Sequence, residues 1–229
     1  MRKLINYALS KIKGKPFILD NQIPLTYLIN IVIGRLFMLI RGHFTLCKHG
    51  KFFFRDKKTV LKAKSKMVFG RGVTISRNCF IDASSRDGIK FGNHVSIGKN
   101  TTIECSGSLL NLGIGLTVGN NVGLGTHGFF GCAGGITIGE DTIFGNFVSL
   151  HSENHNYDNS VIPIRLQGVN RIGITIGKNC WIGSKATILD GAIIEDGCII
   201  GAGSLVKKGQ YSMNGIYAGV PAKFIRNRF

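Results

Sequence analysis

From Phe69 onward the chain repeats in units of six residues. Each unit begins with an aliphatic or aromatic residue, usually followed by Gly, two variable residues, a small or β-branched residue and one more. Residues 97–102 (IGKNTT), 182–187 (IGSKAT) and 200–205 (IGAGSL) are examples. Neither the helical period of 3.6 residues nor the alternation of a simple strand predicts this spacing. The period therefore indicates a solenoid, in which stacked repeats bury a common core.

The leading residues of these hexads fall into six triplets. Within each triplet they are six residues apart, whereas between triplets the spacing is 10, 15, 8, 26 and 6 residues. Additional residues therefore enter only after every third hexad. This predicts a three-sided coil of six turns over residues 67–229, with every insertion at one edge, a long loop at 151–173 and a short C-terminal tail. The leading residues are Phe69, Ile75, Ile81, Phe91, Ile97, Ile103, Val118, Leu124, Phe130, Ile138, Phe144, Leu150, Ile176, Ile182, Ile188, Ile194, Ile200 and Val206.

The composition fits such a coil. The chain has 32 glycines without the strict period of collagen, which suits repeated tight corners. Cys79, Cys180 and Cys198 each stand two residues before a leading position, where small inward side chains recur. We therefore expect buried free thiols and a reducing compartment, and there is no CxxC pair of the kind that binds zinc. Crossover statistics alone would favour a right-handed coil.

Residues 1–66 form a basic extension ahead of the hexads. They contain 15 Lys and Arg against Asp20 and Asp56, a net charge of +13, out of +17 for the whole chain. Such asymmetry predicts an anionic partner, either nucleic acid or phospholipid head groups. Aromatic residues are not interleaved with the charges as a nucleic-acid stacking platform requires, so we expect no nucleic acid.

The apolar run at residues 23–40 decides between these partners. It is nearly long enough to span a bilayer, but Asn30 and Arg35 interrupt it, which favours a helix lying in the membrane interface. The alternative is a helix that caps the open end of the coil or joins a subunit interface. Asp20 and the lack of a small-residue cleavage site make a secretory signal peptide a poor fit. The apolar face comprises Leu25, Leu28, Ile29, Val32, Leu36, Leu39 and Ile40.

Three local features add to the hexads: the long loop after Leu150, the block IGKNCWIG at 176–183 and the block AGVPAK at 218–223. Together they resemble the hexapeptide-repeat acyltransferases, in the branch of the galactoside, maltose and nodulation-factor acetyltransferases and many polysaccharide O-acetyltransferases. The likeness covers residues 138–229, and the hexads extend it to Phe69. It implies an all-β fold, a left-handed parallel β-helix with an N-terminal helical extension, a homotrimer and an acetyl-CoA donor without a metal.

The same resemblance selects a catalytic residue. In that family the catalytic histidine lies five residues after the leading position of the last hexad before the long loop, which here is His155. Histidine titrates near neutral pH and suits a general base that removes a proton from an alcohol. A backbone N–H or Trp181 would line the developing oxyanion. The sugar acetyltransferases commonly have Pro after this histidine, whereas this chain has Asn156. Predicted acceptor contacts are His151, Glu153, Asn154 and Tyr157, with Glu153 or Asp158 as a candidate to orient the imidazole.

Coenzyme A in this family lies in a groove between neighbouring prisms. By position, the resemblance implies contacts from Trp181, Ser184, Gly201 and Ala202. The cations that would meet its phosphates are Lys207, Lys208, Lys223 and Arg226.

The implied activity is acetyl-CoA-dependent O-acetylation of a sugar hydroxyl in a surface polysaccharide or its lipid-linked precursor. We expect it in the cytoplasm, peripherally on the inner face of the bacterial cell membrane. One alternative is an N-acyltransferase acting on an amino sugar nucleotide, and another is a non-catalytic assembly module. A third is a zinc enzyme similar to the γ-class carbonic anhydrases, although the available histidines stand at unlike hexad positions: His94, His127, His151 and His155.

Overall fold

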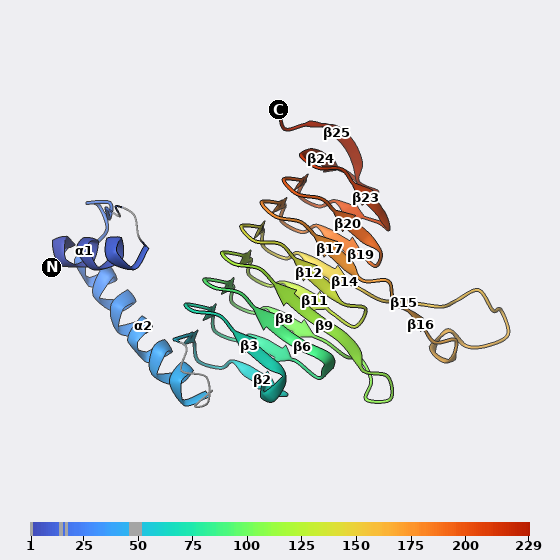
Figure 1. Ribbon diagram of the computed structural model, residues 1–229, viewed down its shortest axis with the longest axis horizontal. Coiled ribbons are helices and arrows are strands. Elements are labelled where there is room, and N and C mark those ends of the chain that lie inside the picture. The colour runs from blue at the N-terminus through green and yellow to red at the C-terminus, as the bar shows by residue number, and fades with distance from the viewer. Residues whose placement is uncertain (1, 14–15, 17, 46–51) are drawn as a thin grey trace.

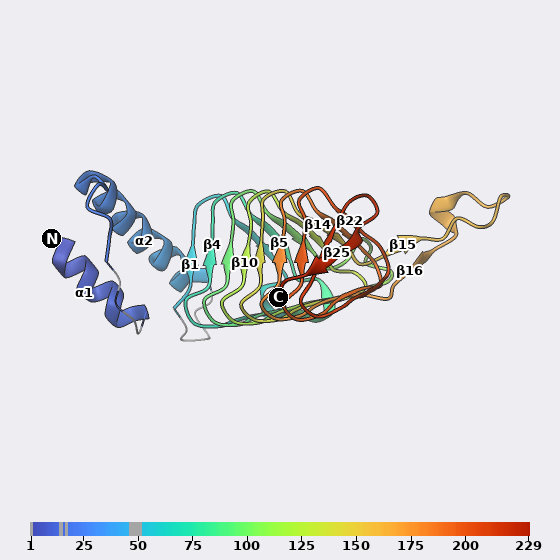
Figure 2. The same ribbon diagram turned by 90° about the horizontal axis from the view of Figure 1, so that it is seen from above.

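The computed structural model describes residues 2–13, 16, 18–45 and 52–229. Its hexads wind into a triangular prism whose three faces are β-sheets of stacked strands (Figures 1 and 2), all parallel except the last strand of sheet A. Sheet A contains β1 (Phe54–Arg55), β4 (Thr74–Ile75), β7 (Ser96–Ile97), β10 (Gly123–Leu124), β13 (Ile143–Phe144), β18 (Trp181–Ile182), β21 (Ile199–Ile200), β24 (Gly215–Ala218) and β25 (Lys223–Asn227).

The other two faces follow along the chain in each coil. Sheet B contains β2 (Val60–Lys62), β5 (Phe80–Asp82), β8 (Thr102–Glu104), β11 (Phe129–Gly131), β14 (Ser149–His151), β19 (Thr187–Leu189) and β22 (Leu205–Val206). Sheet C contains β3 (Met67–Phe69), β6 (Ser85–Phe91), β9 (Gly113–Val118), β12 (Ile136–Ile138), β17 (Ile174–Ile176), β20 (Ala192–Ile194) and β23 (Gly209–Tyr211). A short 3₁₀ turn, η1 (Lys64–Lys66), precedes β3.

The predicted core residues fill the prism. All the leading residues of the hexads are buried, and they form one column against each sheet. In one coil, for example, Val118 lies on sheet C, Leu124 on sheet A and Phe130 on sheet B. Strands are paired in register across neighbouring coils, so equivalent residues stack directly. The expected fold class, a left-handed parallel β-helix with an N-terminal helical extension, is confirmed.

The prism begins one coil earlier than the hexads indicate. Strands β1 and β2 pair with β4 and β5 but lie within the segment 1–66 that was predicted as the extension. Arg55 pairs with Ile75 and so takes a leading, inward position, where its guanidinium donates to the Thr45 hydroxyl and the Thr59 carbonyl. Burial and the nearby Arg41 lower the pKa of Arg55. A cation at an apolar position conceals this first coil from a search for hexads.

Two helices precede the prism: α1 (Arg2–Lys13) and α2 (Leu25–Thr45). The C-terminal half of α2 packs against β1, and the Arg35 guanidinium donates to the Thr74 hydroxyl over 3.0 Å. The N-terminal half extends away from the prism in both views (Figures 1 and 2). By length and composition alone α2 could cross a membrane. The expectation that this segment caps the coil therefore describes its C-terminal half only.

Five of the six cysteines lie in the described part of the chain, and all five are buried free thiols. Burial raises the pKa of Cys180 to about 11, so its thiol stays protonated and unreactive at neutral pH. These thiols act as core filler, as predicted. Cys47 lies outside the described residues.

Neighbouring isoleucines on β20 test the inward columns. Ile194 is fully buried, whereas Ile193 is 48% exposed on the outer face. We expect Ile194→Ala to lower the free energy of unfolding by about 2–5 kcal/mol, because the deletion leaves a cavity in the core. Ile193→Ala is the matched control, with an expected change below about 1 kcal/mol. Denaturant unfolding measures both, and equal losses would contradict the inward assignment.

Candidate functional site

His155 lies on a short two-stranded ribbon at the base of the long loop. Strand β15 (Asn154–His155) pairs antiparallel with β16 (Val169–Asn170), with His155 opposite Val169. The ribbon continues through the Asn156 amide, which donates to the Gly168 carbonyl over 3.1 Å. His155 is exposed to solvent, and the pairing of β15 with β16 fixes the backbone that carries it.

A cleft of about 550 Å³ opens beside this ribbon. His155 shares it with side chains from the neighbouring corner of the prism, which include the two cations Lys207 and Lys208. The lining residues are Asn154, His155, Asn156, Tyr157, Asp158, Asn170, Leu189, Asp190, Lys207 and Lys208. The cleft thus combines a histidine, cations and several hydrogen-bonding groups.

Asp190 holds the returning end of the loop. Its carboxylate accepts hydrogen bonds from the backbone amides of Ile172 and Gly173 at 2.7–3.0 Å, and Asp190 is only 1% exposed. Gly173 has φ +97°, and a Cβ there would stand 2.9 Å from the Gly134 carbonyl oxygen, so the tight return requires glycine. Sequence analysis missed Asp190. The signal was a lone carboxylate two residues after a leading position, where other coils have Ala83, Cys105, Cys132 and Ser152.

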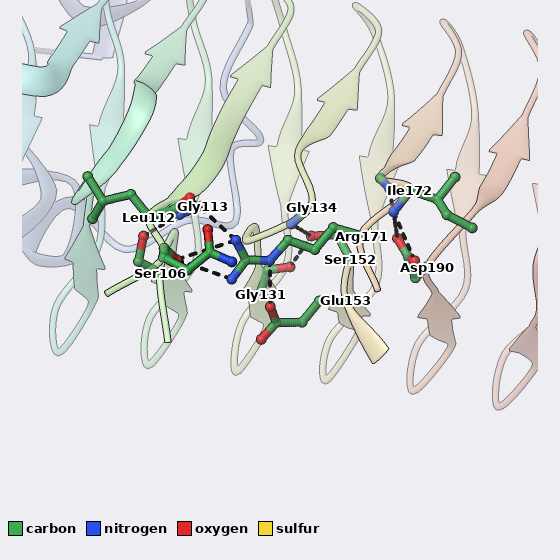
Figure 3. A network of polar contacts seen from close by, with 12 residues as sticks. Ser106, Leu112, Gly113, Gly131, Gly134, Ser152, Glu153, Arg171, Ile172 and Asp190 are labelled. Atoms are coloured by element: carbon green, nitrogen blue, oxygen red, sulfur yellow. Dashed lines mark hydrogen bonds and ion pairs between the residues drawn. The ribbon is translucent and has the colours of Figure 1, made fainter. Parts of the chain in front are cut away.

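Arg171 joins the long loop to the loop at residues 106–112. Its Nε donates to Glu153 Oε2 over 2.9 Å, and its terminal nitrogens donate to the carbonyls of Asn111 and Leu112 at 3.3 Å. Figure 3 shows the guanidinium between the Glu153 carboxylate and the 106–113 segment. The side chains of Arg171 and Glu153 are only 16% and 29% exposed, so this ion pair is partly desolvated. The ion pair joins Glu153, where the chain enters the long loop, to Arg171, where it returns. Sequence analysis missed this contact.

The far end of the loop is closed on itself. Gln167 Nε2 donates to the carbonyls of Asn159 and Ile162, and its Oε1 accepts from the Asn159 amide. A 3₁₀ turn, η2 (Ile164–Leu166), completes this tip. The tip projects well away from the prism (Figures 1 and 2).

The cleft gathers part of the predicted acceptor site. Asn154 and Tyr157 line it together with His155, and so does Asp158. Glu153 instead pairs with Arg171. His151 ends β14 on the outer face of sheet B, with its ring 5.4 Å from that of Phe129. Neither Glu153 nor His151 lines the cleft.

The predicted coenzyme contacts divide into separate groups. Lys207 and Lys208 line the cleft. Trp181 lies on sheet A and is 53% exposed. Ser184, Gly201 and Ala202 occupy the corners between sheets A and B, whereas Lys223 and Arg226 are exposed on β25. Of the predicted coenzyme contacts, one chain alone brings only Lys207 and Lys208 to the cleft of His155.

The histidines considered for a metal lie at different places. His94 and His127 occupy corners with φ +58°, and His127 Nε2 is 2.7 Å from the side-chain Nδ2 of Asn100. His151 is on sheet B and His155 on the ribbon. Within the described ranges no three His, Cys, Asp or Glu side chains gather in a way that could hold a metal ion.

Known proteins resemble this chain in sequence. Residues 173–208 match the family described as bacterial transferase hexapeptide (six repeats). A probable acetyltransferase of Mycobacterium tuberculosis is 29% identical over 142 residues, which are 61% of this chain and 44% of that protein. The chain thus spans less than half the length of this curated relative.

Solved structures share the fold. AntD, an N-acyltransferase from Bacillus cereus, solved with dTDP and coenzyme A, superposes with a TM-score of 0.55 at 18% identity and covers 81% of this chain and 88% of its own. Its complex with dTDP-4-amino-4,6-dideoxyglucose and coenzyme A gives 0.52 at 15% identity, with coverage of 79% and 82%. The resemblance to hexapeptide-repeat acyltransferases expected from the sequence is confirmed.

The pH dependence of folding tests the environment of His151. Burial lowers its pKa below the usual 6.5, so the unfolded chain binds this proton at a higher pH than the folded one. The free energy of unfolding is therefore not reduced by His151 above pH 6.5, and it falls as the pH drops from 6.5 to the lowered pKa of the folded state. We expect His151→Gln to flatten this fall in denaturant titrations across that range. Parallel curves for the variant and the wild type would contradict it.

Replacing Arg171 tests the junction between the two loops. We expect Arg171→Ala to lower the free energy of unfolding by about 1–3 kcal/mol, because Glu153 and two carbonyls lose a charged donor. Hydrogen exchange should rise at residues 106–113. Arg165→Ala, on the exposed tip, is the matched control and should change neither measurement. Unaltered exchange in Arg171→Ala would show that the junction does not order these loops.

Proposed function

We propose that this hexapeptide-repeat chain is an acyl-CoA-dependent O-acetyltransferase that modifies a sugar hydroxyl of a surface polysaccharide or its lipid-linked precursor. The observation that carries the proposal is the position of His155. It faces a cleft of about 550 Å³ together with Lys207 and Lys208, on a ribbon whose base is held by partly buried contacts. The sequence relative, a probable acetyltransferase, supports the same reaction class.

The proposed chemistry is direct transfer between donor and acceptor. His155 removes the proton from the acceptor hydroxyl as its oxygen bonds to the acyl carbon of the thioester. The carbon–sulfur bond breaks, and the proton passes from the imidazolium to the departing thiolate of coenzyme A. No serine or cysteine intermediate is needed. The described cysteines cannot supply one, because they are buried in the prism.

The donor site calls for more than one copy of the chain. The predicted contacts Trp181, Ser184 and Ala202 lie around sheet A and its corner with sheet B, whereas the cleft of His155 lies at the corner of sheets B and C. A homotrimer would set the first corner of one chain against the second corner of its neighbour. Acetyl-CoA would then lie between them, with its phosphates near exposed cations such as Lys207 and Lys208.

The acceptor is chosen by the cleft and the loop. Asn154, Asn156, Tyr157 and Asn170 offer donors and acceptors suited to sugar hydroxyls. The alternative is N-acylation of an amino sugar nucleotide, kept because the fold neighbour AntD is an N-acyltransferase. Both reactions use one base, so only the acceptor separates them. A non-catalytic assembly module remains the third candidate.

We place the reaction in the cytoplasm, peripherally on the inner face of the bacterial cell membrane. Five buried free thiols suit a reducing compartment. An acyl-CoA donor and a lipid-linked acceptor would meet at that surface.

The reaction is tested by thiol release from acetyl-CoA in the presence of an acceptor panel. Free sugars, lipid-linked glycans and amino sugar nucleotides each serve as acceptor. We expect His155→Asn to lower the turnover rate by about 10²–10⁴-fold, as loss of a general base does. His94→Asn, an exposed histidine at a corner, is the matched control and should retain the wild-type rate.

Three outcomes would overturn parts of the proposal. Wild-type turnover in His155→Asn would show that another group is the base. Turnover only with an amino sugar nucleotide would establish the N-acyltransferase. A wild-type protein that neither binds coenzyme A nor modifies any acceptor would favour the assembly module.

A further inference from the structure

Helix α2 exposes apolar side chains around most of its circumference. Its buried residues are Leu28 and Gly42 alone. Ile31 and Ile33, for example, are 43% and 46% exposed. Side chains of this kind on a helix that leaves the prism need an apolar environment. The large exposed apolar residues of α2 are Leu25, Tyr27, Ile29, Ile31, Val32, Ile33, Leu36, Phe37, Ile40 and Phe44.

The attachment of α2 limits how deeply it can enter a bilayer. Arg35 donates to the Thr74 hydroxyl and lies 5.2 Å from the centre of the Phe54 ring, so it is held on the outer face of sheet A. Further along, Thr45 accepts from Arg55 of the first coil. The helix from Arg35 to Thr45 therefore stays at the level of the polar prism.

Because α2 is held against the prism from Arg35 onward, only its residues before Arg35 can enter the hydrocarbon core of a bilayer. Residues 25–34 extend about 15 Å at 1.5 Å per residue. The hydrocarbon core of a bilayer is about 30 Å thick. This free half therefore reaches into one leaflet and cannot cross both.

Charge identifies the kind of surface. Neither helix contains an Asp or Glu, and α1 (RKLINYALSKIK) carries two basic residues at each end. The first coil adds further exposed lysines at positions 57, 58, 62, 64 and 66. Each basic residue near an anionic leaflet adds about 1 kcal/mol to binding. Helices and first coil together match an anionic lipid surface.

We propose that α1 and the free half of α2 form a one-leaflet anchor on an anionic bilayer, with the first coil at the level of the head groups. The prism then extends from this anchored end. Strand β13 stands four strand spacings along the prism from β1, about 19 Å at 4.8 Å per spacing. The anchor therefore holds the cleft of His155 at a defined distance from the anchored coil. This proposal of membrane binding does not depend on the proposed reaction.

Vesicle flotation of the full chain tests this anchor. The vesicles are phosphatidylcholine alone or phosphatidylcholine with phosphatidylglycerol. We expect binding that requires phosphatidylglycerol and weakens in high salt, because the attraction between charges is screened. The double variant Ile31→Glu, Ile33→Glu should lower the partition coefficient by at least about tenfold, because burying charged groups in hydrocarbon is costly.

The matched control makes the same change elsewhere. Leu109→Glu, Leu110→Glu replaces two residues that are 86% and 99% exposed on another loop, and it should bind as the wild type does. Thermal unfolding checks that both variants fold. Equal binding of the α2 variant and the wild type would overturn the proposal. Failure of the wild type to bind anionic vesicles would also overturn it. A third contrary result would be an α2 variant that binds vesicles normally but differs from the wild type in oligomeric state.

Protease access distinguishes one leaflet from a crossing. An N-terminal tag with a cleavage site is added, and protease is supplied outside vesicles that carry the bound protein. A one-leaflet anchor keeps the tag outside and cleavable. Protection of the tag until detergent is added would show that α2 spans the bilayer.

Discussion

The structure depends on the stacking of apolar side chains in three inward columns. Each leading residue of a hexad is buried against its equivalents in the coils above and below, as Ile97 is between Ile75 and Leu124. No coil can bury its column alone, since both of its edges need a neighbour. In-register stacking also keeps the three corners aligned along the whole prism. Whatever is inserted at one corner therefore appears on one edge of the molecule.

This alignment allows loops far apart in sequence to meet. The loop at 106–112 and the long loop at 151–173 both leave between sheets B and C, so the Arg171 guanidinium can reach Glu153 and the carbonyls of Asn111 and Leu112. Asp190, on the same edge one coil later, receives the returning backbone at Ile172 and Gly173. Partly or fully buried polar contacts thus hold both sides of the ribbon that carries His155. The tip beyond it is ordered by its own hydrogen bonds and remains available to a second molecule.

The two ends of the prism are finished differently. At the last coils, β25 folds back antiparallel on β24 and supplies the outermost strand of sheet A. At the first coil, Arg55 takes an inward position, where its two terminal nitrogens donate to Thr45 of α2 and to the Thr59 carbonyl, while its buried Nε has no partner among the described residues. The same helix, α2, also carries the exposed apolar side chains that precede Arg35. The proposed anchor is thus joined directly to the core through one polar cluster.

The repeat, the three-sided coil, the inward residues and the edge that carries the loops could all be predicted from the sequence, because burial of hexads imposes a six-residue period along the chain. The family resemblance added His155, with Asn154 and Tyr157 as acceptor contacts and Lys207 and Lys208 as coenzyme contacts, and the structure brings these five residues to one cleft. Only the tertiary structure revealed the first coil, the junction at Arg171 and the role of Asp190. These features depend on single polar contacts between residues distant in sequence, such as Arg55 with Thr45 or Arg171 with Asn111, and such contacts leave no periodic pattern along the chain.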